Sequence, residues 1–314
     1  MLTSDRPFYS IVTPTFNREH LLRRLYDSLC EQSFPAMEWV VIDDGSTDNT
    51  EKMIRSLTED SPFPIVYRWQ ENGGKHRALN HALEVVSGEF FVDIDSDDYL
   101  LPGSLAVYYE LWMSQTCEIK ERLGGMVADS VHTDGRVVGR AFPGTEIITN
   151  AIELRRKLKV RGDKLYMYKV CVAREFPSPE FPGENFIQES VRHRRIARRY
   201  DLLATSKAGR VKDYQEGGLS SSSGRQLPNA LRNPRGYQLR TLEAMNFRAK
   251  ENARELWKEC VNYVRFSFHC DVPLKVQCHQ VRNKSLWLSA LAFGVARYLI
   301  DCSRYPQLKH TSLR

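Results

Sequence analysis

Four aspartates follow a short apolar run in residues 90–102, which have the sequence FFVDIDSDDYLLP. Phenylalanine, valine and isoleucine predict a buried strand here. Unpaired charges are costly in a protein core, so we expect the carboxylates to lie at the C-terminal end of the strand, facing solvent or a cation. In an extended chain Asp95 and Asp97 would share one face and could hold one hard divalent ion. For this pair taken alone, a solvated acidic loop is the alternative.

The chain before this stretch alternates between strand and helix patterns. Strands are predicted at 8–16, 38–42, 65–69 and 90–94, with helices at 50–57, at 76–86 and after Asn17, which we expect to cap the first helix. This alternation is typical of an open, largely parallel sheet, and such sheets bind ligands beyond the carboxyl ends of their strands. The three loops 13–18, 43–48 and 95–98 would converge at that edge, which favours a binding site over a solvated loop.

The second half of the chain differs in pattern and in charge. A helix is predicted at 104–113, a strand at 124–130, a helix beginning near Glu189, and further helices at 236–250, 251–268 and 285–300. Residues 1–190 hold 21 Lys+Arg and 30 Asp+Glu, a net charge of −9, whereas residues 191–314 hold 24 and 9, a net charge of +15. A basic C-terminal part indicates an anionic partner. Because no nucleic-acid-binding motif is present, we expect no nucleic acid and keep an anionic membrane surface as the candidate.

Three features favour a cytoplasmic location. The seven cysteines are scattered and odd in number, unlike a disulfide framework. The first residues show no signal-peptide pattern, and no stretch reaches the roughly 18–20 apolar residues that would be expected to span a bilayer.

The last predicted helix is strongly apolar and has two interpretations. It packs within a helical bundle, or it lies on the inner face of an anionic membrane as a peripheral anchor.

The motifs, taken in order, resemble those of family 2 glycosyltransferases, which have the GT-A fold. The matching stretches are SIVTPTFN (10–17), VVIDDGSTDNT (40–50), NGGKHRALNHAL (72–83) and GEFFVDIDSDD (88–98). A weaker match, FPGENFIQES (181–190) followed by YQEGGLS (214–220), is similar to members that build surface glycans. The resemblance implies an α/β fold, a GT-A Rossmann-like mixed sheet flanked by helices, over residues 1–230. Its donor-binding half would be 1–115 and its acceptor half 116–230, with a C-terminal helical region at 231–314.

The resemblance also implies a nucleotide-sugar site. Pro14 and Phe16 would line the nucleobase pocket, Asp44 would bind the uracil edge, and Lys75 or Arg77 would approach the base or the diphosphate. The implied nucleotide-binding set is completed by Thr15, Asn17, Arg18, Asp95 and Ser96. Asp97 would ligate the metal, Mn²⁺ or Mg²⁺, with Asp95 supporting it or contacting the ribose or the sugar. Residues 214–220, which contain two glycines, would form a mobile loop that closes over the site.

The catalytic base is less directly implied, because the usual Glu-Asp pair is here Glu189-Ser190. Glu189 is the candidate base and Glu184 the second candidate. The Gln-x-x-Arg-Trp motif of processive synthases is absent, so the resemblance implies single sugar addition. The expected function is metal-dependent, inverting transfer from a nucleotide-sugar donor, with UDP as the expected nucleotide, to a glycan or lipid-linked saccharide. The alternatives are a non-catalytic nucleotide- or glycan-binding relative, which the departure at residue 190 leaves open, and a sugar nucleotidyltransferase, which would need a glycine-rich loop at 13–18.

Overall fold

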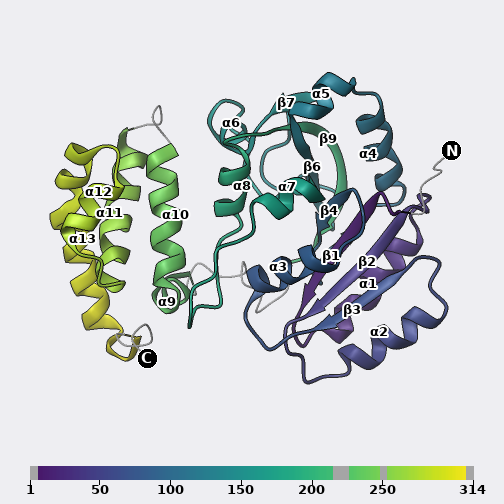
Figure 1. Cartoon of the computed structure of the whole chain (residues 1–314), viewed down its shortest axis with the longest axis horizontal. Coiled ribbons are helices and arrows are strands. Elements are labelled where there is room, and N and C mark those ends of the chain that lie inside the picture. Colours follow the sequence, from purple (N-terminus) through teal and green to yellow (C-terminus); the bar gives the residue numbers. More distant parts are fainter. Residues whose placement is uncertain (1–5, 215–225, 248–252, 309–314) are drawn as a thin grey trace. The chain divides into compact units, whose positions relative to one another are not determined.

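The computed structural model describes residues 6–214, 226–247 and 253–308 (Figure 1). It divides into a sheet unit, Met1–Pro177 with Arg192–Ser221, and a helical unit, Ser178–Val191 with Ser222–Arg314. The predicted boundary at residue 230 differs from this division, because segment 178–191 groups with the helices. The backbone N–H groups of Asn185 and Phe186 donate to the Asn233 side chain at 2.8 and 3.0 Å, which ties the segment to them. Apart from Tyr214, the loop predicted at 214–220 lies outside the described residues.

Four parallel strands form one half of the sheet, in the order β3-β2-β1-β4. They are β1 Tyr9–Thr15, β2 Met37–Asp43, β3 Ile65–Trp69 and β4 Phe90–Asp93, connected by α1 Glu19–Cys30, α2 Thr50–Glu59 and α3 Lys75–Val85. The predicted alternation of strand and helix is therefore confirmed. Because Thr15 pairs with Asp43 and Asp43 with Trp69, the first three strands end level with one another.

The other half of the sheet is mixed, and the path continues β4-β8-β6-β9-β5, with β7 paired to β9. These strands are β5 Tyr99–Leu100, β6 Leu123–His132, β7 Ile147–Thr149, β8 Leu165–Lys169 and β9 Asp201–Lys212. The accompanying helices are α4 Ser104–Met113, α5 Cys117–Arg122, α6 Ala151–Arg156, α7 Val170–Glu175 and α8 Ser190–Ile196. The strand β8 is antiparallel to both β4 and β6, so the sheet as a whole is mixed, as the resemblance implied.

Each face of the sheet has its own apolar core. Side chains of α1, α2 and α4 pack with Ile11 and Val92 on one face, whereas side chains of α3, α6 and α7 pack with Val12 and Phe91 on the other. Neighbouring strand residues thus point to opposite faces, and both faces are covered. Central strands buried on both sides are almost wholly apolar, which is why polar residues gather where these strands end.

The helical unit contains α9 Gln226–Arg232, α10 Pro234–Phe247, α11 Ala253–His269, α12 Leu274–Gln280, α13 Lys284–Arg304 and the short helix η1 Pro306–Leu308. Helices α11 and α13 are joined by a buried ion pair in which Nε and Nη2 of Arg265 each lie 2.5 Å from an oxygen of the Asp301 carboxylate. His269 Nε2 lies 3.0 Å from the same carboxylate. A helix bundle held by buried charges can keep those charges only because they are paired.

Helix α13 corrects one expectation from the sequence. Its 21 residues are long and apolar enough, by length and composition alone, to cross a membrane, whereas the sequence indicated no such stretch. One side of the helix is buried in the bundle: Trp287 and Ala290 are in its core, and Gly294 lies so close to Val264 of α11 that a β-carbon there would clash. Packing within the bundle is therefore confirmed for this side of the helix.

Candidate active site

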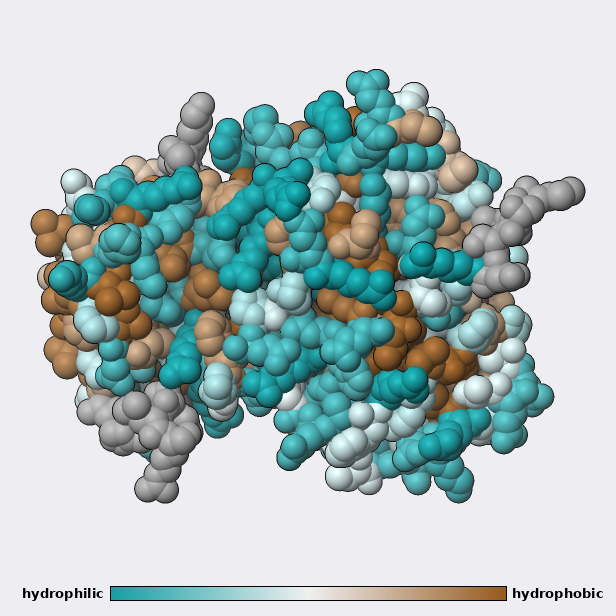
Figure 2. All heavy atoms as spheres, viewed as in Figure 1, coloured by the Kyte–Doolittle hydropathy of each residue, from teal (hydrophilic) through white to brown (hydrophobic). Residues whose placement is uncertain are grey.

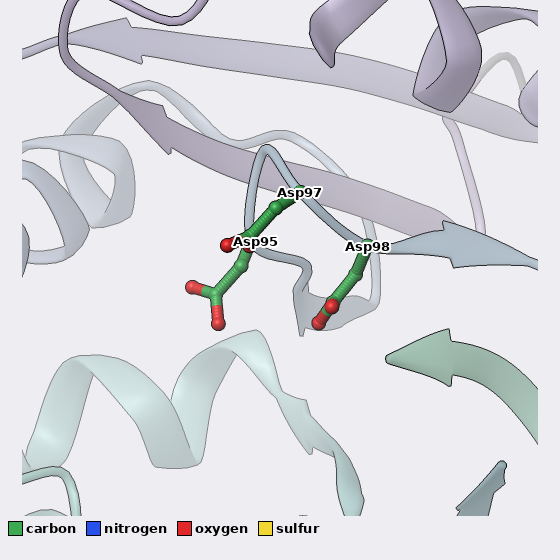
Figure 3. Close-up of side chains that lie close together, drawn as sticks. All are labelled: Asp95, Asp97 and Asp98. Carbon is green, nitrogen blue, oxygen red and sulfur yellow. The ribbon is translucent and has the colours of Figure 1, made fainter. Parts of the chain in front are cut away.

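The three carboxylates that follow β4, those of Asp95, Asp97 and Asp98, lie on a turn. The Asp98 N–H donates to the Asp95 carbonyl oxygen at 3.0 Å, which is the hydrogen bond of a β-turn. One carboxylate oxygen from each of Asp95, Asp97 and Asp98 lies within 4.8 Å of the others (Figure 3). The expectation of an extended chain with Asp95 and Asp97 on one face was wrong, because the chain turns here and brings in Asp98 as a third carboxylate.

Basic side chains from distant parts of the chain surround this acidic turn, residues 95–98. Lys75, the first residue of α3, contacts Asp95, and its Nζ lies 3.4 Å from Asp93 Oδ2. Arg18 Nη1 lies 3.0 Å from Asp97 Oδ2. The sequence placed Lys75 and Arg18 in the nucleotide site, and both lie at the acidic turn.

Two further basic residues come from β9 and were not found from the sequence. Lys212 Nζ lies 3.1 Å from Asp95 Oδ2 and 3.0 Å from Asp98 Oδ2, and Arg210 Nη1 lies 3.6 Å from Asp98 Oδ2. Tyr99 of β5 pairs with Val211 of β9 in an antiparallel register. Asp98, which precedes Tyr99, therefore lies opposite Lys212, which follows Val211. The spacing of Arg210 and Lys212, two residues apart, would have put both on one face of a strand, but no strand was predicted there.

The surrounding charges move the pKa values of these groups in opposite directions. Burial alone would raise the pKa of Asp95, but the ammonium groups of Lys75 and Lys212 hold it well below its usual range. Burial raises the pKa of Asp98 to about 6, and repulsion from Asp95 adds to this, although Arg210 opposes it. Asp98 thus binds a proton more readily than Asp95 does.

The acidic turn has the donor atoms that a hard divalent cation requires. Carboxylate oxygens are the preferred protein ligands of Mg²⁺ and Mn²⁺, and three of them converge here. Asp98 is buried, and its Oδ1 has no hydrogen-bond partner among the described residues, whereas its Oδ2 is paired with Lys212. Asp95 and Asp97, the ligands expected from the sequence, therefore fit a metal together with Asp98.

The loop after β1 contributes the residues expected at the nucleobase. Pro14 is buried within β1. The last residue pair between β1 and β4 is Val12 with Asp93, so Pro14 lies beyond it and its missing N–H removes no hydrogen bond between these strands. Thr15 is buried, and its hydroxyl has no hydrogen-bond partner among the described residues. Phe16 is 47% exposed. An exposed aromatic ring can stack on a planar group, and a buried hydroxyl without a partner can still bind a polar one.

Asn17 has a different role from the one expected. It has a positive φ of 51°, and its side-chain oxygen accepts a hydrogen bond from the Thr47 N–H at 2.7 Å. The expected cap of α1 by Asn17 was therefore wrong. Instead, Asp48 Oδ2 accepts the Glu19 N–H at 3.2 Å, at the start of α1. The Asn17 side chain thus joins the loop after β1 to the loop after β2. Asparagine tolerates a positive φ better than most residues do.

The carboxylate of Asp44 organises the turn after β3. Its Oδ1 accepts hydrogen bonds from the Gln70 side chain at 2.7 Å and the Gly73 N–H at 2.8 Å, and its Oδ2 accepts the Gly74 N–H at 2.8 Å. The backbone N–H groups of Asn72-Gly73-Gly74 could either cradle a phosphate or belong to a plain turn. Because both glycine N–H groups already bind Asp44, the structure favours the plain turn. Among the other expected residues, Ser96 is buried at the acidic turn and Arg77 is in the first turn of α3.

The two candidate bases have different surroundings. Glu184 is buried, and its two oxygens accept the N–H groups of Arg235 and Gly236 at 2.7 and 2.8 Å, at the start of α10. Burial raises its pKa, although these backbone hydrogen bonds oppose the rise. Glu189 is half-buried and directly precedes α8, as expected from the sequence. Glu184 thus stabilises a helix N-terminus, which weakens its case as the base.

The sequence of the N-terminal region matches one protein family. Residues 10–118 match the family model described as Glycosyl transferase family 2. This region is a family 2 glycosyltransferase domain with the GT-A fold, and the resemblance predicted from the four motifs is confirmed.

Two curated relatives and two solved structures show the extent of the similarity. The chain is 37% identical over 102 residues to the GalNAc(5)-diNAcBac-PP-undecaprenol beta-1,3-glucosyltransferase of Campylobacter jejuni, covering 32% of this chain and 33% of that protein. It is 35% identical over 94 residues to the poly(ribitol-phosphate) beta-N-acetylglucosaminyltransferase TarS of Staphylococcus aureus, covering 29% and 16% of the two chains. The matched region spans less than half the length of these curated relatives.

The solved structures cover nearly the whole chain. The crystal structure of S. aureus TarS 1–349 in complex with UDP-GlcNAc has a TM-score of 0.59 and 21% identity, over 96% of this chain and 88% of that one. The mannosyltransferase PcManGT from Pyrobaculum calidifontis, in complex with GDP-Man and Mn²⁺, has a TM-score of 0.53 and 17% identity, over 95% and 88%. At these identities the likeness extends to the fold, including the mixed sheet followed by helices.

Proposed function

We propose that the chain is a metal-dependent, inverting glycosyltransferase that moves one sugar from a UDP-sugar to a glycan or lipid-linked saccharide. The observation that carries this proposal is the acidic turn at the carboxyl end of β4, next to the loops that follow β1 and β2. Three carboxylates within 4.8 Å of one another suit a divalent ion, and ligands of parallel sheets bind at this edge. The match to glycosyltransferase family 2 over these same residues supports the assignment.

The donor would be held by both loops and by the acidic turn. Phe16 and Pro14 would line the base, and Asp44 would face the uracil edge while it also holds the turn after β3 in place. The unsatisfied hydroxyl of Thr15 and the side chains of Asn17, Arg18 and Ser96 would complete the nucleotide site. Lys75 and Arg77, which begin α3, would approach the diphosphate. UDP is the proposed nucleotide because the similar TarS fold has been solved with UDP-GlcNAc bound.

Transfer needs a deprotonated acceptor hydroxyl and a stabilised leaving group. Glu189 would take the proton of the acceptor hydroxyl, a general-base role that contributes about 10²–10⁴-fold. The acceptor oxygen then bonds to the anomeric carbon as the bond to the diphosphate oxygen breaks, which inverts the anomeric centre. Asp95, Asp97 and Asp98 would hold Mn²⁺ or Mg²⁺, which when bound neutralises charge on the diphosphate. Lys75 and Arg18 would add positive charge on the same side.

A surface-glycan acceptor and single addition are also proposed. The Campylobacter relative is named for a lipid-linked acceptor, and TarS is named for a poly(ribitol-phosphate). Both are anionic, as the +15 charge of residues 191–314 would favour. Single addition rests on the absent Gln-x-x-Arg-Trp motif. A sugar nucleotidyltransferase is disfavoured by the family match, whereas a non-catalytic relative remains the competing proposal.

We further propose a cytoplasmic location, peripheral on the inner face of the membrane through α13. Figure 2 shows apolar side chains gathered on the surface of the C-terminal helices. Four large apolar side chains of α13 are more than half exposed: Leu288, Phe293, Leu299 and Ile300. The exposed charged residues of this helix are all basic, namely Lys284, Arg297 and Arg304, because Asp301 is buried in its ion pair. An apolar face with basic residues along it suits an anionic bilayer.

The membrane proposal can be tested by co-sedimentation with vesicles. We expect binding to phosphatidylglycerol vesicles, weaker binding to phosphatidylcholine vesicles, and loss of binding in a Leu288→Ser/Phe293→Ser variant. Leu274→Ser, which changes an exposed leucine on α12 (45% exposed, against 64% for Leu288), is the control and should bind normally. If the double variant binds as the wild type does, α13 is not the contact.

The proposed function is tested by thermal stability against UDP, GDP, CDP and TDP, each with and without Mn²⁺. A ligand that binds the folded state at 100 times its Kd stabilises it by about 2.7 kcal/mol. We expect a rise in Tm with UDP that requires Mn²⁺, and then transfer from a UDP-sugar. Absence of a shift with every nucleotide would favour the non-catalytic relative.

A further inference from the structure

The Lys212 side chain occupies the acidic turn in a way that bears on metal binding. It is buried, at 8% exposure, and its Nζ bridges two carboxylates of the turn, at 3.1 Å from Asp95 and 3.0 Å from Asp98. Asp163 lies farther off, at 3.9 Å. The contacts leave the ammonium between two of the three carboxylates that a divalent ion would use.

The charges around the turn are close to balanced. Five carboxylates, Asp93, Asp95, Asp97, Asp98 and the half-exposed Asp163, contact four basic side chains, Arg18, Lys75, Arg210 and Lys212. Without a nucleotide, the turn therefore has little surplus negative charge with which to attract a divalent cation. A cation that enters beside Asp95 also meets the ammonium of Lys212 at close range, and like charges repel strongly in a site of reduced dielectric.

A nucleotide diphosphate reverses this balance because it brings several negative charges. The lysine ammonium is a compact charge on a four-carbon stem, so it can turn from the carboxylates toward a phosphate without moving the strand. We propose that Lys212 is the counter-ion of the acidic turn before the donor binds and pairs with the diphosphate afterwards, so that metal and nucleotide bind cooperatively. The proposal rests on the proposed function and adds a residue that controls when the metal binds.

The variant Lys212→Gln distinguishes a lysine that controls metal binding from one that only stabilises the fold. Mn²⁺ binding is measured by electron paramagnetic resonance with and without UDP. We expect the wild type to bind Mn²⁺ at least about tenfold more tightly with UDP than without it. In Lys212→Gln we expect Mn²⁺ alone to bind about tenfold more tightly than in the wild type, and UDP to add less than about threefold.

Two further variants serve as controls. Lys207→Gln removes an exposed lysine from the same strand and should behave as the wild type does. Lys212→Arg keeps the positive charge at the turn and should keep weak binding of Mn²⁺ alone together with strong coupling to UDP. Because it keeps the ion pairs, this variant tests the proposal even if Lys212→Gln does not fold.

The outcomes distinguish this proposal from the proposed function. If the wild type binds Mn²⁺ and UDP cooperatively but Lys212→Gln binds Mn²⁺ alone no more tightly than the wild type, the Lys212 proposal is overturned by itself. Tight binding of Mn²⁺ alone by Lys212→Arg would overturn it as well. If the wild type binds neither UDP nor Mn²⁺, the proposed function and the Lys212 proposal are both overturned.

Discussion

Replacing Asp44 by asparagine tests how the nucleotide site is built. Asp44 is buried, and its carboxylate accepts three hydrogen bonds of 2.7–2.8 Å, from the Gln70 amide and from the N–H groups of Gly73 and Gly74. An asparagine amide has the same shape but one acceptor oxygen, so it can keep the two bonds made by Oδ1. Its NH₂ group would then face the Gly74 N–H, where two donors oppose each other.

The size of the effect follows from this count. A hydrogen bond to a charged group contributes about 1.5–3 kcal/mol, and a buried donor left unsatisfied costs about 1–3 kcal/mol. We therefore expect Asp44→Asn to lower the free energy of unfolding of the sheet unit by about 3 kcal/mol. UDP affinity should fall too, because the turn held by Asp44 leads directly into α3, which begins with Lys75.

The assay is urea denaturation, with Asp97→Asn as the matched control for stability, followed by a UDP titration of the wild type and of Asp44→Asn. The Asp97–Arg18 pair is partly exposed, with side-chain exposures of 15% and 29%, so its loss should cost no more than about 1 kcal/mol. An Asp44→Asn protein as stable as the wild type but unable to bind UDP would refute the reasoning. It would mean that the carboxylate serves the nucleotide and contributes little to the turn.

Three further predictions follow from the contacts. Asp97→Asn should reduce Mn²⁺-dependent transfer at least about 10³-fold, since a bound metal contributes several kcal/mol of transition-state stabilisation, and initial rates across Mn²⁺ concentrations check this. Glu189→Gln should keep UDP binding and lower the transfer rate about 10²–10⁴-fold. Glu184→Gln should lower the free energy of unfolding by about 1–2 kcal/mol and keep the transfer rate, and the reverse pattern would exchange the two roles. The pKa of Asp301 is lowered because its contacts with His269 and Arg265 outweigh its burial, so its contribution to stability should be present above its usual pKa of about 4 and be lost as the pH falls below that value. Asp301→Asn should lower the free energy of unfolding by about 3–5 kcal/mol at pH 7, measured by denaturation, and should remove this pH dependence.

The parallel half of the fold could be predicted because its signals are local. Each of its strands is an apolar run that ends in polar residues, and each connecting helix has an apolar stripe, so periodicity alone locates them. The convergence of three loops then follows from a general rule for parallel sheets. For the same reason Asp95, Asp97 and Arg18 were placed near one another without knowledge of any long-range contact.

Asn17 and the acidic turn show where local patterns mislead. An asparagine before a helix is a good cap in isolation, but here its side chain binds the Thr47 N–H, and Asp48 serves the helix instead. Likewise Asp95 and Asp97 would share a face only if the strand continued. The strand ends at Asp93, and the turn that follows it brings in Asp98. A contact with the neighbouring loop determines the role of Asn17, and the end of the β4 pairing determines where Asp95 and Asp97 lie.

The basic side of the site could not be predicted, because it depends on strand register across a long separation. Lys212 and Asp95 are 117 residues apart and meet because the two-residue strand β5 pairs with β9. Two residues give too short a pattern for sequence to reveal such a pairing. Yet this pairing sets the net charge of the acidic turn, and with it the attraction for a divalent ion. A substitution on β9 can therefore change metal binding in this chain while every aspartate of the turn stays in place.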